Sequence, residues 1–101
     1  CYVDDMEDAV LATLTRPEAV DETFNVGNPR SVLTIYQLAR DVVRLSGSHS
    51  RITFVPWDNK DVDLRIPNIE KAQALLGYQP RVDLEQGLLR TIEWYRNRLP
   101  A

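Results

Sequence analysis

Residues 61–80 read DVDLRIPNIEKAQALLGYQP, and this stretch places one arginine just ahead of a short helix. Pro67 disfavours helical backbone at Ile66, the residue before it, so Arg65 is expected in an extended Arg-Ile-Pro segment. Asn68 is a good N-cap, because its side-chain oxygen can accept an amide hydrogen bond from the first turn. Gly77 suits the left-handed backbone position that ends a helix. The apolar face of this helix consists of Ile69, Ala72, Leu75 and Leu76.

Arg65 is the candidate for chemistry in this stretch. A guanidinium on a stiff backbone just before a helix can bind a phosphate through two parallel hydrogen bonds. The alternative is structural: Arg65 pairs with Asp61 or Asp63, or is solvated. The spacing alone leaves both interpretations open, and it favours the structural one.

Helical periodicity and capping residues predict three further helices. They cover residues 5–15, 34–46 and 83–99. Asp4 or Asp5 is expected to cap the first of them, Thr34 to cap the second, and Gly47 to end the second. Alternation of polar with β-branched or aromatic residues predicts short strands at 23–26 and 51–56, and residues 31–33 are expected to be extended. These elements favour a small α+β domain, mostly helical, in which a few short strands pair and the helices cover them.

Three other residues are candidates for a functional or a packing role. Asn28, in the turn after residues 23–26, could contact a nucleotide or sugar, or it could hold the turn together. Trp57 could stack on a base or wall a pocket, but closing the edge of the core is the favoured interpretation. Gly87 lies inside a predicted helix, where glycine is unfavourable, and this indicates close packing against a neighbour.

The composition limits the classes of function. A length of 101 residues suits a single small domain, and a net charge of −3 without a basic run argues against nucleic-acid binding. The single cysteine and single histidine exclude an intrachain disulfide and a Cys/His metal cluster. No apolar run is long enough to span a membrane, and no targeting segment is visible. We therefore expect no nucleic-acid, metal or membrane partner, and a cytoplasmic location.

Three motifs make the chain similar to a known family. Residues 61–96 fit the pattern DxxxRxPxIxKAxxLLGYxPxxxLExGLxxTIxWYR, residues 2–5 read YVDD, and residues 24–29 read FNVGNP. Together they resemble the C-terminal end of the NAD-dependent nucleotide-sugar epimerases, dehydratases and decarboxylases, which are extended short-chain dehydrogenases. The resemblance covers essentially all of the chain. It implies that residues 1–101 form the small substrate-binding lobe of such an enzyme.

The resemblance also implies what the chain lacks. The family holds NAD in an N-terminal Rossmann-type half that carries a Gly-rich loop and a Tyr-x-x-x-Lys catalytic pair. Here the four glycines are single and scattered, no Tyr-x-x-x-Lys is present, and the chain opens on Cys1 inside an expected element. We therefore expect a piece of a longer enzyme. This piece would bind no NAD itself, contain no catalytic residue and not catalyse alone.

For the longer enzyme, the resemblance implies that NAD⁺ oxidises the sugar at C4 before epimerisation, elimination or decarboxylation. The lobe would bind the nucleotide-diphosphate sugar, with Arg65 on the diphosphate or the sugar acid and Asn28 on the nucleotide side. The run DVDLRIP is most similar to the UDP-glucuronate decarboxylase branch. The longer protein would thus be a lyase or an isomerase, and a homodimer.

Two other interpretations stay open. The chain could be a stand-alone small-molecule-binding or oligomerisation module without a cofactor, which would explain the missing catalytic motifs. It could also belong to a nicotinamide reductase of the same superfamily that acts on a non-sugar substrate. In that case Arg65 would have no diphosphate to bind.

Overall fold

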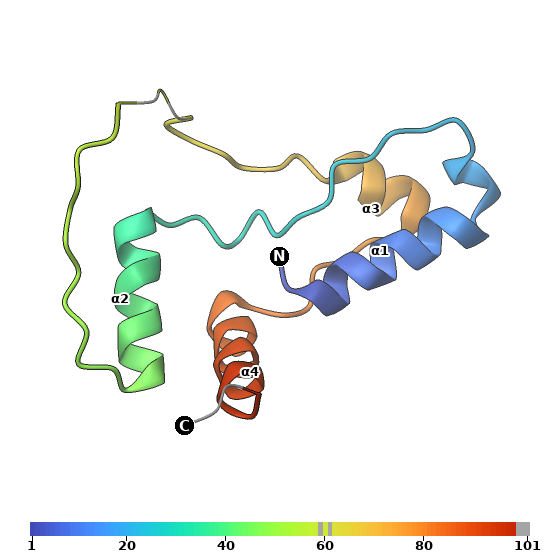
Figure 1. Cartoon of the computed structure of the whole chain (residues 1–101). Coiled ribbons are helices and arrows are strands. Elements are labelled where there is room, and N and C mark those ends of the chain that lie inside the picture. Colours follow the sequence, from blue (N-terminus) through green and yellow to red (C-terminus); the bar gives the residue numbers. More distant parts are fainter. Residues whose placement is uncertain (59, 61, 99–101) are drawn as a thin grey trace. The chain divides into compact units, whose positions relative to one another are not determined.

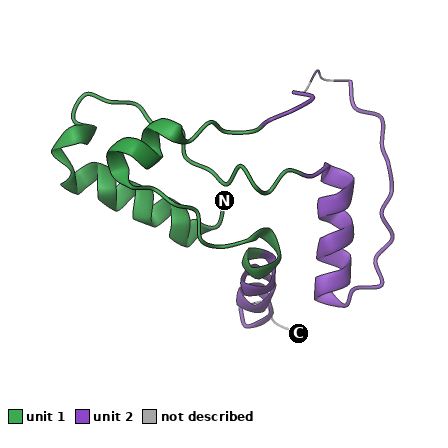
Figure 2. Ribbon diagram, turned by 180° about the vertical axis from the view of Figure 1, so that it is seen from behind, with its two compact units in different colours: residues 1–32, 66–87 green, residues 33–65, 88–101 purple. Residues whose placement is uncertain are grey.

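Segments that are distant in sequence come together in each of the two compact units of the computed structural model. The structure describes residues 1–58, 60 and 62–98. Residues 1–32 and 66–87 make the first unit, and residues 33–65 and 88–101 make the second (Figure 2). The expectation that residues 1–101 act as one lobe stays a prediction.

Three helical segments of the first unit contact one another: α1 (Val3–Thr15), η1 (Pro17–Ala19) and α3 (Glu70–Leu76) (Figure 1). η1 is a single 3-10 turn that begins at a proline, whose fixed φ suits the first position of a helix. α1 begins earlier than the sequence predicted, because Tyr2 and not an aspartate is its N-cap residue. Asp4 and Asp5 therefore lie in its first turn, where negative charge suits the helix dipole.

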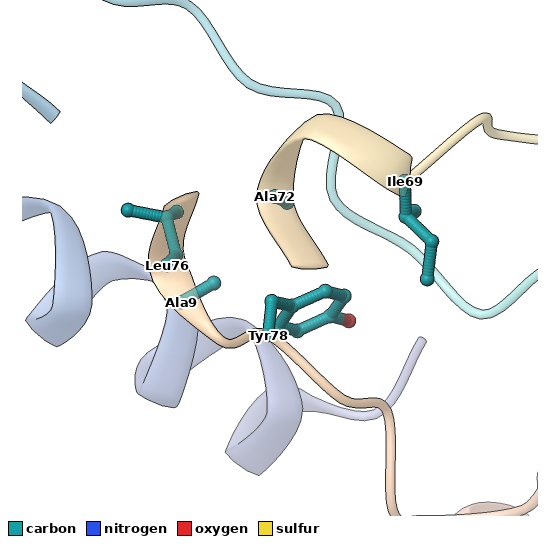
Figure 3. Packing of buried hydrophobic residues seen from close by; sticks show 5 residues of the cluster. All are labelled: Ala9, Ile69, Ala72, Leu76 and Tyr78. Carbon is teal, nitrogen blue, oxygen red and sulfur yellow. The ribbon is translucent and has the colours of Figure 1, made fainter. Parts of the chain in front are cut away.

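The core of the first unit lies between α1 and α3 (Figure 3). Its buried members are Ala9, Ile69, Ala72, Leu76 and Tyr78. Ala9 and Ala72 are almost fully buried, and their small side chains allow the two helix backbones to approach closely. Phe24 and Val26, from the chain that follows η1, pack against this cluster.

The C-terminal end of α3 forms as the sequence predicted, whereas its N-cap residue is Ile69 and not Asn68. The side-chain oxygen of Asn68 accepts a hydrogen bond of 2.9 Å from the amide of Glu70, the first residue of the helix. Gly77 has a φ of 66°, and its amide donates to the carbonyl of Gln73 at 3.1 Å. The left-handed stop is confirmed. Asn68 therefore bonds to the first residue of α3 without being its N-cap, and Gly77 ends the helix.

The second unit contains α2 (Ile35–Ser46) and most of α4 (Leu84–Arg96), which begins in the first unit. The side-chain oxygen of Thr34 accepts the amide of Gln37 at 3.1 Å, so the predicted N-cap of α2 is confirmed. Gly47, with a φ of 65°, ends this helix as predicted. Local capping rules therefore give the bounds of α2 correctly.

The helices are short. α1 and α4 have 13 residues each, and α2 has 12. Within the described part of the chain, no helix combines the length and the apolar character needed to cross a membrane.

The predicted strands do not form. Residues 23–26 and 51–56 have no β-ladder, and the described residues contain no strand. The α+β assignment is therefore wrong in its β part, while the mostly helical part is confirmed. A strand needs a neighbour to pair its amides and carbonyls. Residues 51–56 are exposed throughout, and residues 23–26 pack Phe24 and Val26 into the core instead.

Gly27 and Pro67 make a tight contact in the first unit. A Cβ built on Gly27 would lie 2.7 Å from Cγ of Pro67, which is closer than non-bonded side-chain atoms pack. The pyrrolidine ring is rigid and cannot swing away as a long side chain would. Glycine at position 27 is therefore a condition for holding the FNVGNP loop against the chain just before α3.

We expect Gly27→Ala to destabilise the protein by about 1–3 kcal/mol, because the added methyl group overpacks this contact. Urea unfolding followed by circular dichroism measures the change. The double variant Gly27→Ala/Pro67→Ala is the control, since removal of the ring makes room for the methyl group. It should lose clearly less stability than the sum of the two single variants. Strict additivity would show that the two residues do not press on each other.

Candidate functional site

Arg65 lies just before α3 in chain without regular secondary structure, and it is exposed. Two residues later, Pro67 packs on Gly27, and Asn68 accepts the amide of Glu70. These contacts belong to the first unit, whereas Arg65 is the last residue of residues 33–65 in the second unit. Asp61, one of the two carboxylates considered as partners, lies outside the described residues. The phosphate-binding role of Arg65 stays a prediction.

Asn28 is buried, and its side-chain amide serves two backbone groups. Nδ2 donates to the carbonyl of Val82 at 3.3 Å, and Oδ1 accepts from the amide of Arg30 at 3.0 Å. The backbone carbonyl of Asn28 also accepts from the amide of Ser31 at 3.2 Å. These contacts give Asn28 a structural role: it closes its own turn and holds the turn against Val82.

Arg30 fixes the same turn from its outer side. Its Nη2 donates to the carbonyl of Pro80 at 2.8 Å and lies 3.3 Å from Oδ1 of Asp83. Both charged side chains are more than half exposed, so the ion pair itself adds little stability. The bond to the Pro80 carbonyl is the contact that positions the backbone.

Asp5 is the residue that the sequence analysis missed. It is 1% exposed, and its two carboxylate oxygens accept the amides of Arg81 and Val82 at 2.9 and 3.1 Å. The sequence analysis treated Asp5 as a helix cap. A signal was present nonetheless, because Asp5 is four residues before Ala9 and so falls on the face of α1 that enters the core.

Tyr78 also bonds to the turn at 27–31. It is buried, and its hydroxyl donates to the carbonyl of Gly27 at 3.0 Å. Burial, and then the negative charge of Asp5, raise the pKa of Tyr78 above its usual value of 10.0. The phenol is therefore a neutral hydrogen-bond donor over the physiological pH range.

Asp5, Asn28, Arg30 and Tyr78 together form what we call the anchor cluster. Its members tie the turn at 27–31 and helix α1 to residues 80–83, which follow α3 and Tyr78 in the chain. Every hydrogen bond described above for the cluster, apart from the Arg30–Asp83 pair, has a backbone group on one side. Among the described residues, no group of three or more His, Cys, Asp or Glu side chains could hold a metal ion. The arrangement can position a backbone, and it contains no nucleophile with an adjacent base.

A pocket of about 270 Å³ lies at the edge of the first unit's core. Its walls include Ala12, Leu76 and the residues Asp8 and Arg81, which form an ion pair. Neither Arg65 nor Asn28 lines it. The structure thus does not bring the two predicted site residues to this pocket.

Two further sequence predictions have clear outcomes. A Cβ on Gly87 would lie 3.1 Å from the ring of Tyr2, so close packing at Gly87 is confirmed. Trp57 is 71% exposed, so the interpretation that it closes the edge of the core is wrong. The predicted strand at 51–56, which precedes Trp57, does not form, and Trp57 lies in chain without regular secondary structure.

Sequence comparison finds curated relatives over almost all of the chain, whereas no protein-family model matches it. UDP-glucuronic acid decarboxylase 1 of Xenopus tropicalis is 38% identical over 98 residues, which are 97% of this chain and 23% of that protein. UDP-N-acetyl-alpha-D-glucosaminuronate decarboxylase of Bacillus cytotoxicus is 30% identical over 94% of this chain and 31% of that protein. UDP-glucuronate 4-epimerase of Thermodesulfobacterium geofontis is 29% identical over 97% of this chain and 30% of that protein.

The chain spans only 23–31% of the length of these three relatives. The part that it matches is their C-terminal part. The chain is therefore homologous to the C-terminal part of the NAD-dependent nucleotide-sugar epimerases and decarboxylases. The resemblance that the three motifs indicated is confirmed.

Asp5→Ala should lower the free energy of unfolding by about 3 kcal/mol, because the buried amide of Val82 and the partly buried amide of Arg81 lose their acceptor. Glu7→Ala is the matched control, since Glu7 is an exposed carboxylate on the same helix. It should change the stability by no more than about 0.5 kcal/mol. Urea unfolding measures both variants. Equal losses in the two would show that Asp5 does not anchor residues 81 and 82.

The raised pKa of Tyr78 predicts a loss of stability in alkali. In the unfolded chain the phenol ionises near pH 10, whereas in the folded chain it stays neutral to higher pH. The contribution of Tyr78 to the free energy of unfolding is therefore complete below pH 10, and it is lost as the pH rises through the pKa of the folded state. Tyr78→Phe should flatten this fall in the free energy of unfolding, measured from roughly pH 8 to pH 11. The other tyrosines are common to both proteins, so parallel curves would contradict the prediction.

Proposed function

We propose that the chain acts as the sugar-nucleotide-binding lobe of an NAD-dependent UDP-sugar decarboxylase or a related epimerase, with the decarboxylase favoured. The observation that carries the proposal is the 38% identity, over 97% of the chain, to UDP-glucuronic acid decarboxylase 1 of Xenopus tropicalis. The names of the three relatives share one substrate class, a UDP-linked sugar acid. A ligand of this class is the first to test.

Such a substrate carries negative charge on its diphosphate and on its sugar carboxylate. A chain with a net charge of −3 and no basic run must bind it through individual, placed cations. Arg65 fits this role because it is exposed and because it directly precedes Ile66, where the chain enters the first unit. A guanidinium can bind a phosphate or a carboxylate through two parallel hydrogen bonds.

Asn28 supports the proposed site indirectly, by holding a turn in place. Its amide holds the turn that carries Gly27, and Gly27 in turn contacts Pro67, two residues after Arg65. Direct contact between Asn28 and the nucleotide stays a prediction, because the same amide already serves Val82 and Arg30. The proposed role of the lobe is therefore orientation of the substrate and neutralisation of its charge.

We assign NAD to the region that the relatives carry outside the matched segment. A dinucleotide site needs glycines where the backbone approaches the pyrophosphate. The four glycines of this chain already have other roles: Gly47 and Gly77 end helices, Gly27 meets Pro67, and Gly87 meets Tyr2. The residues of this chain thus do not fit the cofactor. A homodimer and a cytoplasmic location belong to the same proposal for the longer protein and rest on the family resemblance.

The proposal predicts that UDP-glucuronic acid binds the chain with roughly millimolar affinity, because the lobe offers only part of a substrate site. Amide NMR shifts during titration measure this binding. Arg65→Ala should weaken it about tenfold or more, since a hydrogen bond to a charged group contributes about 1.5–3 kcal/mol. Arg51→Ala is the matched control, another exposed arginine in irregular chain, and should leave the affinity unchanged.

Titrations with UDP and UDP-glucose show whether Arg65 binds the diphosphate or the sugar carboxylate. An equal loss for all three ligands in Arg65→Ala would place Arg65 on the diphosphate, and a loss confined to UDP-glucuronic acid would place it on the sugar acid. A folded chain that responds to none of the three ligands would contradict the proposal. Unchanged binding in Arg65→Ala would contradict the role of Arg65.

A further inference from the structure

Helix α1 carries a second apolar stripe that does not enter the core of the first unit. Its core-facing residues are Asp5, Ala9 and Ala12. The second stripe consists of Val3, Met6, Val10 and Leu14, which recur at intervals of three and four residues and so share one face of the helix. At about 100° per residue, this face is turned well away from the face that contains Ala9.

The second stripe is exposed along the whole helix. Val10 is 49% exposed, and Leu14, near the end of α1, is 77% exposed. A surface helix normally keeps one apolar face and turns polar residues to solvent, whereas a helix that is apolar on two faces is usually buried in a larger protein. The four apolar residues form a continuous row, with the charged Glu7 at its edge, and such a row suits a surface that is covered by other apolar groups.

The comparisons indicate what covers it. The relatives are three to four times as long as the matched segment, and the match lies in their C-terminal part. α1 is the first element of the matched segment, so in the relatives it follows most directly on the region ahead of it. Elements that are consecutive in sequence usually lie side by side in space.

We infer that the stripe of Val3, Met6, Val10 and Leu14 packs against an apolar face of the region that such relatives carry ahead of the matched segment. The contact is an interface between the two parts of one longer polypeptide. The inference rests on the homology and on the exposed stripe, and it is independent of whether Arg65 binds a sugar nucleotide. A second copy of this chain is the competing occupant.

The test uses two proteins: the 101-residue chain, and a hybrid in which this chain replaces the C-terminal part that it matches in the Xenopus tropicalis decarboxylase. Val10→Glu is made in both, with Leu11→Glu as the matched control. Leu11 is the next residue on the same helix and is 51% exposed, but it lies off the stripe. The two substitutions therefore add the same charge at equal exposure and differ only in the face that receives it.

In the 101-residue chain, both variants should keep the Tm within about 2 °C of the parent, because both positions are solvated. In the hybrid, Val10→Glu should lower the Tm by about 5 °C or more, because the carboxylate is forced into an apolar contact. Leu11→Glu should leave the hybrid's Tm nearly unchanged. Leu14→Glu, a second position on the stripe, should follow Val10→Glu in both proteins.

Three results would overturn the inference. The first is an equal effect of Val10→Glu in the chain and in the hybrid. The second is a hybrid that does not fold although the chain does, since the stripe would then not fit the region offered to it. The third comes from sedimentation of the chain alone: a dimer that Val10→Glu dissociates and Leu11→Glu does not would identify a second copy as the occupant.

Discussion

The first unit depends on one buried contact, the carboxylate of Asp5 with the amides of Arg81 and Val82. The bonded residues are 76 and 77 positions apart in the chain. Closing a loop of this size costs conformational entropy, and two charge-assisted hydrogen bonds away from water offset part of that cost. Asn28 holds the carbonyl of Val82 from the other side. Residues 80–83 are thereby fixed between helix α1 and the turn at 27–31.

The three motifs that reveal the family meet one another in this unit. YVDD provides Asp5, FNVGNP provides Gly27 and Asn28, and the end of α3 provides Tyr78, whose hydroxyl reaches the carbonyl of Gly27. None of these residues has the environment of a nucleophile or a general base. Their chemistry is that of hydrogen bonds to backbone groups and of close packing. These marker residues therefore position the backbone and pack the first unit.

The parts of the fold that the sequence predicted correctly are those that local interactions decide. The Thr34 cap, the stop at Gly77 and the short helix between Asn68 and Gly77 each depend on residues within one or two turns of each other. The strand at 51–56 failed because alternation specifies extended chain, while a strand also needs a partner that is remote in sequence. Asp5 was missed for the same reason, since nothing near it in the sequence announces the amides that it binds. The extended backbone at Arg65 depends on residues near it in the sequence, whereas the ligand proposed for Arg65 cannot be inferred from those residues.

The contacts that stabilise the first unit are also those that would prepare Arg65 for a ligand. A guanidinium recognises a phosphate through two parallel hydrogen bonds, and this geometry is useful only where the backbone is already in place. Pro67 restricts Ile66, the residue before it, and Gly27 has no side chain that would keep the Pro67 ring away. The turn that presents Gly27 is in turn held by Asn28. Under the proposed role of Arg65, stability and recognition would share one chain of contacts, and Asn28 would matter for binding without touching the substrate.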